Sequence, residues 1–443
     1  MEKVTNKNIL KLVSLCILLI VPFLKFFSMN LEVYGIITIY DFINPAIVLY
    51  VSIPFLIFVY IKDIIDSKRK LDICDYIFYI LILAGILSTV FSINKNLAIF
   101  GKDFRHEGFL SILSYYLLFI NWKINGTKDD IKSFIKLLTF IAIINSIYAL
   151  FQIYFPFNFI VKYANDTKMA SGMCGNPNFF GSLIVTVISI ITCKYLTVKD
   201  KPIKSIMLII LLFISLINCQ STGPFLTFIV VFIFLLLFLC KKRYLMLKRI
   251  FVLIITLIIT YIAIYFVNMH VFVNKFGHDS NRCELCELKE TFDSGGSGRI
   301  DIWKNSLDIV ANHFITGVGF DNFYLAYPNP KVEYSVSFTI ENGIIKREEP
   351  NSYYIVDNAH NVYLHTLVST GIIGLIPYLL LCLLTFINGL KTKDKLVFII
   401  FSGFVAYSVQ AFANISVIQV APIYYIIIGL ILSQNNNQTK SLT

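Results

Sequence analysis

The sequence predicts an all-α, polytopic membrane protein. Of its 443 residues, 57% are hydrophobic and only 15% are charged. The mean hydropathy of +0.74 is far above what a water-soluble domain requires. Runs without charge that approach or exceed the ~20 residues needed to cross a bilayer recur along the chain. We therefore expect one integral membrane domain over residues 1–443, with about twelve transmembrane helices.

The positions of the charges give the individual spans. Single helices are predicted at residues 12–29, 42–61, 76–94, 108–122, 137–161, 169–193, 250–274 and 362–390. The run at 108–122 is short and crosses only with help from its flanks. Two longer runs, 205–240 and 396–439, must each fold back once, near residues 218–224 and 413–416. The first span shows no small-residue cleavage site, so we expect it to stay in place as an ordinary helix.

The net charge of +11 is explained by where the cations lie. Lys and Arg cluster at alternate ends of the spans, while the short connections between the other ends carry neither. By the positive-inside rule the basic side is cytoplasmic, which predicts both termini in the cytoplasm and a multi-pass protein of a bacterial plasma membrane. This rule accounts for the charge, so we expect membrane lipid and no nucleic acid as a partner.

The same rule places one large loop, residues 275–358, outside the membrane. Within it residues 299–311 predict a short amphipathic helix that starts after Ser297-Gly298, with an apolar stripe that includes Ile302, Leu307 and Val310. Residues 316–320 predict a turn, and residues 331–357 are charged, mixed in type and expected to be mobile. A loop of this length is usually functional or disordered, and this one is long enough to act as a lid.

Most of the nine cysteines lie in or beside apolar runs, where they act as small hydrophobic side chains. Cys283 and Cys286 lie in the large loop and leave two interpretations open. They form a disulfide or remain plain thiols, which we favour, or they are half of a zinc site completed by His278. We predict no metal site and no cofactor.

Two residues of the large loop suit transfer from an anionic leaving group. His360 lies where the polar loop meets an apolar run, and Arg299 lies near Trp303. A guanidinium pairs with phosphate oxygens through its planar fork, and an imidazole accepts a proton near neutral pH. Structural interpretations stay open for both, because His360 could cap a helix and Arg299 could be a solvated charge. Arg105, just before the span at 108–122, could equally be a headgroup anchor.

The order of several motifs resembles that of a known family. These motifs are Gly298-Arg299 with Trp303, Gly317-Val318-Gly319, Ala359-His360-Asn361, Gly371-Ile372-Ile373-Gly374, Gly175-Asn176-Pro177-Asn178 with Gly181, and Arg105-His106-Glu107-Gly108. Together they look like the O-antigen ligase and polymerase superfamily of membrane glycosyltransferases, whose Gram-positive members share an arginine-glutamate-glycine segment like the last of these. Each motif is loose alone, and the specificity lies in their order.

The resemblance implies a GT-C-like, metal-independent, inverting glycosyltransferase. Its donor would be a glycan on a polyprenyl pyrophosphate, such as undecaprenyl pyrophosphate, and its acceptor a hydroxyl of a glycan, lipid or protein. By the same resemblance His360 is the candidate base and Arg299 the candidate pyrophosphate clamp. Further candidate substrate-binding residues are Arg105, Asn361, Trp303 and Asn178.

One position departs from the family pattern. Ligases of this group usually carry a serine-arginine pair at a hairpin between two central spans, whereas this chain has Ser221-Thr222-Gly223-Pro224. Arg105 could supply the missing cation, the donor could be held differently, or activity could be reduced.

Two further questions stay open at this level. Polar residues at the outer span ends, such as Asn145, Gln152 and Asn414, could line a cavity or join helices by hydrogen bonds. A polysaccharide polymerase is slightly favoured over a ligase. The alternative from another class is a polytopic transporter or flippase of lipid-linked glycan, which would predict paired halves and charges at the membrane midplane.

Overall fold

A computed structural model gives the fold. It describes residues 5–33, 44–67, 69–102, 105–155, 169–198, 201–241, 247–276, 298–328, 331–333, 338–341, 344–347 and 353–440. Cys283, Cys286 and His278 lie outside the described residues, so their interpretation is unchanged.

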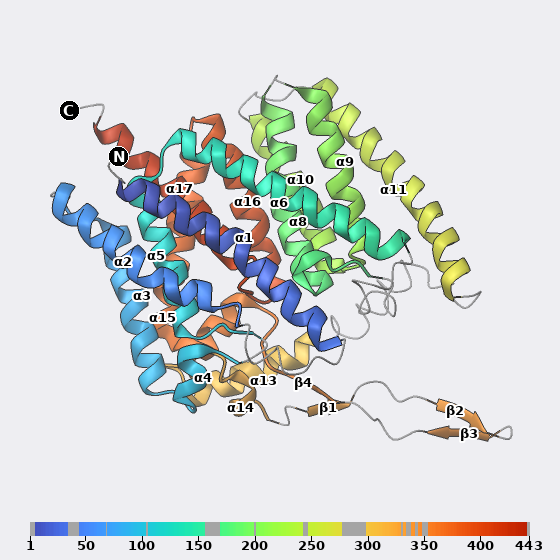
Figure 1. Cartoon of the computed structure of the whole chain (residues 1–443), viewed down its shortest axis with the longest axis horizontal. Helices are drawn as coiled ribbons and strands as arrows, with labels where there is room; N and C mark the ends of the chain where they lie inside the picture. The colour runs from blue at the N-terminus through green and yellow to red at the C-terminus, as the bar shows by residue number, and fades with distance from the viewer. Residues whose placement is uncertain are drawn as a thin grey trace.

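The described chain is a bundle of long apolar helices (Figure 1). Nine of them are long and apolar enough to cross a membrane. These are α1 (Asn6–Val33), α2 (Ile47–Ser67), α3 (Ile73–Val90), α6 (Lys128–Tyr154), α8 (Pro177–Thr197), α10 (Thr222–Lys241), α11 (Leu247–Phe276), α15 (Val362–Lys391) and α16 (Lys395–Gln410). Three further helices of the bundle are α5 (Phe109–Asn125), α9 (Pro202–Asn218) and α17 (Ala421–Lys440), whose apolar part ends at Gln434. The helical, multi-pass membrane class is confirmed, and the count of about twelve spans stays a prediction.

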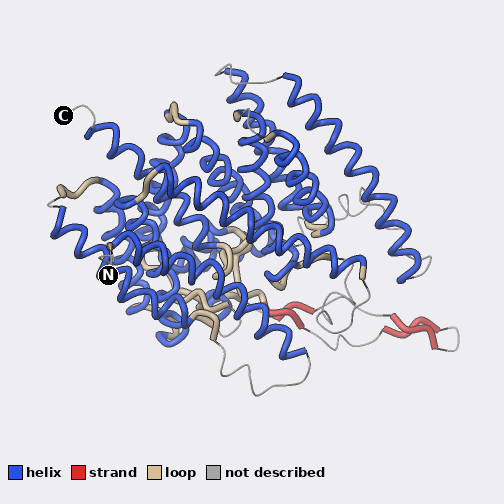
Figure 2. Tube along the Cα trace, turned by 45° about the horizontal axis from the view of Figure 1, so that its top comes forward, coloured by secondary structure: helices blue, strands red, loops and turns tan. Residues whose placement is uncertain are grey.

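Smaller elements fill the connections. They are α4 (Lys95–Phe100), η2 (Gly172–Cys174), α13 (Arg299–Asn312), α14 (Phe323–Ala326) and η4 (Ala411–Ala413), with the strands β1 (Lys331–Glu333), β2 (Phe338–Glu341), β3 (Ile344–Arg347) and β4 (Tyr353–Ile355). β1 pairs with β4 and β2 with β3, both antiparallel. The large loop therefore adds two short strand pairs to the helical body, and Figure 2 shows both at one end of the bundle.

The predicted fold-back points coincide with helix ends. The run at 205–240 is split between α9, which ends at Asn218, and α10, which begins at Thr222. The run at 396–439 is split between α16 and α17 by η4. Asn176 caps α8 by accepting the Asn178 N–H at 2.8 Å, and Pro177 occupies the first turn, where its missing N–H costs nothing.

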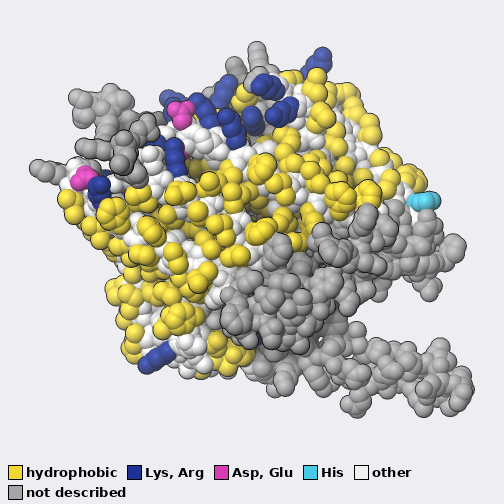
Figure 3. Space-filling view, in the orientation of Figure 1, with side chains coloured by type: hydrophobic (Ala, Val, Ile, Leu, Met, Phe, Trp, Pro, Cys, Tyr) yellow, Lys and Arg dark blue, Asp and Glu magenta, His cyan; other side chains and the backbone are white. Residues whose placement is uncertain are grey.

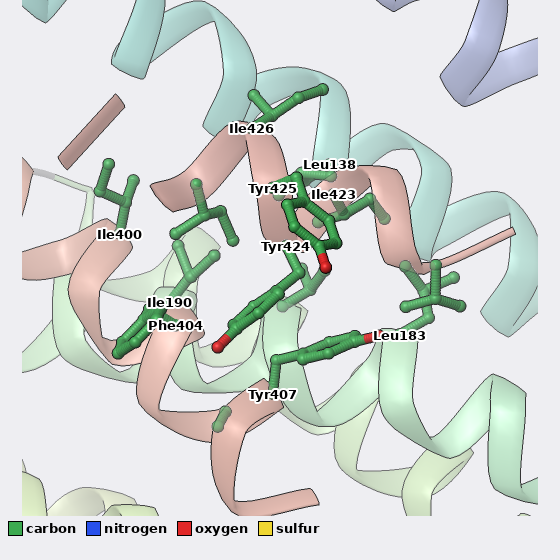
Figure 4. Packing of buried hydrophobic residues seen from close by; sticks show 14 of the residues in the cluster. Leu138, Leu183, Ile190, Ile400, Phe404, Tyr407, Ile423, Tyr424, Tyr425 and Ile426 are labelled. Carbon is green, nitrogen blue, oxygen red and sulfur yellow. The ribbon is translucent and has the colours of Figure 1, made fainter. Parts of the chain in front are cut away.

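Aromatic packing joins the central helices. The Tyr424 ring of α17 stacks on Tyr407 and Phe404 of α16, with centroids 4.3 and 5.4 Å apart (Figure 4). Tyr425 stacks on Tyr115 of α5 at 5.6 Å. α8 is almost entirely buried among its neighbours, whereas α11 at the edge of the bundle is mostly exposed. The apolar side chains that face outward from the bundle form a broad hydrophobic band, as a lipid environment requires (Figure 3).

One end of the bundle gathers the cations. Figure 3 shows Lys and Arg side chains along one edge, above the hydrophobic band. There Lys7 and Lys11 of α1 pair with Asp130 of α6 at 2.7 and 2.8 Å, and the buried Lys123 of α5 pairs with Asp72 at the start of α3. α13, α14 and the strands lie at the opposite end (Figure 1). The charge asymmetry expected from the sequence is therefore present, and which end faces the cytoplasm stays a prediction.

Candidate functional site

Three parts of the chain meet at the end opposite the cations: residues 101–102 and 105–108 before α5, the start of α13, and residues 356–361 before α15. The Arg105 guanidinium joins the first to the third. Its Nε donates to Asp357 Oδ2 at 2.9 Å and its Nη2 donates to Asp357 Oδ1 at 3.0 Å. The two side chains are only 15% and 16% exposed, so Arg105 is turned into the protein.

His360 lies in the turn that leads into α15. Its backbone adopts a φ of 50°, and its N–H donates to Asn358 Oδ1 at 3.1 Å. The indole of Trp303 donates from Nε1 to the carbonyl of Ala359 at 2.9 Å, which ties α13 to this turn. Trp303 thus has a structural contact beside the candidate base, and a direct substrate contact stays a prediction.

The electrostatic setting of His360 is cationic. Burial, followed by the charges of Arg299 and Arg105, lowers the pKa of His360 to about 4, and Asp357 acts in the opposite direction. The imidazole is therefore neutral at physiological pH and can accept a proton. The predicted base and both predicted cations thus lie within electrostatic reach of one another.

Arg299 is the first residue of α13, after Gly298 in a left-handed conformation. The guanidinium is half-buried and, among the described residues, makes no hydrogen bond or ion pair, and burial lowers its pKa. A partly desolvated guanidinium without a carboxylate partner is ready to receive an anion. α13 itself agrees with the predicted helix, except that Leu307 is exposed. Ile302, Ile309 and Val310 form the buried face, because they share a face at helical spacing and pack toward α15.

A second carboxylate holds the backbone around Arg105. Asp321 Oδ2 accepts the N–H of Lys102 at 2.9 Å and that of Glu107 at 3.1 Å. Burial raises the pKa of Asp321 to about 6. Burial, reinforced by Asp321, raises the pKa of Glu107 to about 8, although Ser416 Oγ donates to its carboxyl at 2.9 Å. The Arg105 segment is thereby fixed by contacts to the large loop and to the connection before α17.

His106 is buried beside these groups. Burial, followed by the charge of Lys25 of α1, lowers its pKa to about 3. Among the described residues no three His, Cys, Asp or Glu side chains are grouped so that they could hold a metal ion.

A break in α15 accommodates the segment that follows α13. Gly371 lies inside the helix with φ 63° and ψ −168°, which frees the carbonyls before it. Val318 N–H donates to Val368 O at 2.9 Å and Gly319 N–H to Ser369 O at 3.0 Å. The segment expected as a turn at 316–320 therefore runs along the broken helix. A Cβ on Gly317 would lie 2.4 Å from Ser369 backbone atoms, so the approach needs glycine there.

Asn178 belongs to a neighbouring contact. Its side-chain oxygen accepts from Ser221 Oγ in the hairpin between α9 and α10, and the next residue, Phe179, places its ring 5.6 Å from the Arg105 guanidinium carbon. Asn414 donates to the Asn178 carbonyl at 3.2 Å. Asn178 therefore links the hairpin to the Arg105 region, and its contact with substrate stays a prediction.

The polar residues at the outer span ends mostly join helices. Gln152 accepts the N–H groups of Ser171 and Gly172 at 3.1 and 2.9 Å, and Asn145 accepts that of Met173 at 3.0 Å. Asn414 also donates to Ser182 Oγ at 2.6 Å. For these side chains the hydrogen-bonding interpretation is the one that the structure supports.

Comparison with known proteins agrees with this arrangement. Residues 206–379 match the model of the O-antigen ligase family. Residues 206–379 are therefore similar to the O-antigen ligase family. This region runs from α9 into α15 and contains Arg299, Trp303 and His360, whereas Arg105 and Asn178 precede it. A search of curated proteins gave no match. The resemblance inferred from the motifs is thereby confirmed.

The missing arginine of the O-antigen ligase pattern can be related to this geometry. Thr222 begins α10, next to Ser221, which contacts Asn178. Asn178 adjoins Phe179, whose ring faces Arg105. The hairpin and Arg105 therefore approach the same region from two parts of the chain, which is compatible with Arg105 taking over the charge absent at Thr222.

Two carboxylates near these motifs were not singled out from the sequence, Asp357 and Asp321, and Glu107 was named only as part of a motif. Asp357 lies only three residues before His360, so its proximity to the candidate base could have been noticed. Its pairing with Arg105 could not, because 252 residues separate the two.

Asn361 caps α15 in this region, with its side-chain oxygen accepting the N–H groups of Tyr363 and Leu364, both at 3.0 Å. We expect Asn361→Ala to lower the free energy of unfolding by about 1 kcal/mol, because two amides lose their acceptor. Asn361→Ser keeps a capping oxygen and should restore thermal stability. A serine variant that is stable but poorly active would assign the amide to substrate instead of the cap.

Proposed function

We propose that the protein is a membrane glycosyltransferase that moves a glycan from a polyprenyl pyrophosphate to an acceptor hydroxyl at the outer face of a bacterial plasma membrane. The observation that carries the proposal is the ion pair of Arg105 with Asp357, three residues before His360, and the influence of the Arg299 and Arg105 charges on that imidazole supports it. The match to the O-antigen ligase family supports a glycan ligase or polymerase. Both termini are proposed to be cytoplasmic, on the basic side.

In the proposed reaction the acceptor oxygen forms the new bond to the anomeric carbon as the bond from that carbon to the pyrophosphate oxygen breaks. His360 takes the acceptor hydroxyl proton, and the bonding electrons leave with the pyrophosphate. Direct displacement inverts the anomeric centre. The charge that develops on the leaving group needs fixed cations, and two guanidiniums beside the base supply them without requiring a metal ion.

The two arginines differ in whether a carboxylate already pairs with their charge. Arg299 has no acidic partner among the described residues and is the proposed pyrophosphate clamp. Arg105 is already paired with Asp357, so part of its charge is offset. We propose that Arg105 contacts the donor as a second, more strongly positioned cation. Trp303, Asn361 and Asn178 are proposed to line the same region.

The test uses full-length purified protein and lipid-linked glycan extracted from cells in which the gene is deleted. Product sizing that shows a ladder indicates polymerisation, one discrete conjugate indicates ligation, and movement of the unaltered lipid-linked glycan across vesicles indicates a flippase instead. We expect Arg299→Lys to lower kcat/KM by about tenfold or more, because lysine lacks the bidentate fork. The matched control is Lys304→Ala, since Lys304 is exposed on the same helix.

A further inference from the structure

Asp357 occupies the side of the Arg105 guanidinium formed by Nε and Nη2. Its two oxygens lie 2.9 and 3.0 Å from these donors, and both side chains are largely removed from solvent. Two parallel charge-assisted hydrogen bonds fix the plane of the guanidinium as well as its position. An arginine held in this way enters a reaction with little orientational freedom to lose.

The same carboxylate belongs to the segment that carries the candidate base. Asn358 and Ala359, between Asp357 and His360, are fixed by the hydrogen bonds to the His360 N–H and from the Trp303 indole. Asp357 and His360 are therefore held in one short and well-tied turn. Through Asp357, the position of Arg105 is coupled to that of His360.

Charged groups face His360 from several elements. Arg299 lies on α13, Arg105 on the segment before α5 and Asp357 on the turn itself, while His365 faces it from α15 and Lys102 faces Asp357. Asp357 is the carboxylate among these groups, and it raises the pKa of His360 against the two guanidiniums that lower it. Burial would raise the pKa of Asp357, but Arg105, Lys102 and His360 hold it below its usual value, so this carboxylate is charged.

We propose that Asp357 is the positioning residue of the site: it fixes the Arg105 guanidinium side-on and offsets its charge beside His360. This inference rests on the proposed glycosyl transfer. Without the offset, a base next to two uncompensated cations would hold a proton too weakly to take one efficiently from an acceptor hydroxyl. Because Asp357 pairs with Arg105, Arg299 is the guanidinium that has no acidic partner among the described residues and is available to bind the pyrophosphate.

The test is Asp357→Asn, which keeps the size of the side chain and an acceptor oxygen but removes the charge. We expect kcat to fall by about tenfold, since a weaker base is a poorer proton acceptor. The KM for the lipid-linked glycan should not rise, because the charge of Arg105 is released. The acid limb of the kcat/KM profile should move to lower pH, because His360 loses the group that raises its pKa. A purely structural role would lower the yield of folded protein without moving that limb.

Two matched variants and one double variant complete the design. Asp301→Asn removes an exposed carboxylate on α13 and should leave activity unchanged. Asp321→Asn removes a buried carboxylate that holds only backbone N–H groups and should not move the acid limb. If Asp357 acts through Arg105, Asp357→Asn should lower kcat by a smaller factor in the Arg105→Ala variant than in the native protein.

An unmoved acid limb in Asp357→Asn, with additive effects in the double variant, overturns the inference. The proposed function fails separately, if His360→Asn retains transfer or if no glycosidic product forms with the native protein. Melting temperature and monodispersity in detergent identify a variant that has not folded. If Asp357→Asn does not fold, Asp357→Glu takes its place, because it keeps the charge but moves it. Asp357→Glu must then show the native acid limb of kcat/KM with a reduced kcat.

Discussion

Replacing His360 by asparagine should abolish glycan transfer and leave the protein folded. His360 has a φ of 50°, a left-handed conformation in which asparagine is among the best tolerated residues after glycine. His360→Asn therefore removes the imidazole without adding backbone strain, whereas alanine would add it. A general base contributes about 10²–10⁴-fold to a rate, so kcat should fall by that factor. The measurement is product formation by purified protein, with thermal unfolding recorded alongside.

The control is His313→Asn, because His313 is exposed at the end of α13. It should retain native transfer. Full activity in the His360 variant, with the same melting temperature, would remove the imidazole from the reaction and leave only the cations to explain catalysis.

The pH dependence of transfer follows from the charges around His360. Its pKa of about 4 in the free protein, set by burial and then by Arg299 and Arg105, places the acid limb of kcat/KM near that pH. Bound pyrophosphate brings negative charge that offsets the two guanidiniums and favours the protonated imidazole. The acid limb of kcat, which reports the complex, should therefore lie at higher pH. Coincident limbs would mean that the phosphates do not approach His360.

Gly371→Ala should destabilise the protein strongly, because it combines backbone strain with steric overlap. The φ of 63° with ψ −168° at this position is essentially restricted to glycine, and such strain costs about 1–3 kcal/mol. In addition, a Cβ would lie 2.0 Å from the carbonyl oxygen of Ile315, a backbone atom that cannot move aside alone. We expect a large loss of folded protein and a lower melting temperature.

Two other glycines separate strain from steric overlap. Gly298 has a φ of 78°, but a Cβ added there would meet nothing within 4 Å, so Gly298→Ala tests strain alone. At Gly223 the nearest atom would lie 3.4 Å from the added Cβ and φ is ordinary, so Gly223→Ala should be nearly neutral. The expected order of destabilisation is Gly371, Gly298, Gly223. Equal effects at Gly371 and Gly298 would contradict the steric argument.

Much of the helical architecture could be predicted because it depends on local properties of the chain. Absence of charge over about 20 residues marks a span wherever the span packs. The start of α13 at Arg299 could be recognised because first turns have their own residue preferences. The roles of His360 and Arg299 stay predictions, which were made because these residue types suit proton and phosphate chemistry.

The remaining features depend on contacts between distant parts of the chain. Leu307 was assigned to the apolar stripe of α13, but the buried face of that helix consists of Ile302, Ile309 and Val310, and Leu307 is exposed. Asp357 and Asp321 resemble any other polar loop residues until the fold brings them to Arg105. The broken helix at Gly371 was likewise hidden, because Gly371-Ile372-Ile373-Gly374 is compatible with a continuous apolar helix.

The long separations in these contacts bear on how the protein is made. Arg105 meets Asp357 across 252 residues, and Glu107 accepts a hydrogen bond from Ser416 across 309. During synthesis Arg105 and Glu107 are therefore made long before Asp357 and Ser416, and the contacts form only after most of the polypeptide has left the ribosome. A prematurely terminated chain would lack these contacts, so the proposed site is complete only when the finished bundle surrounds it.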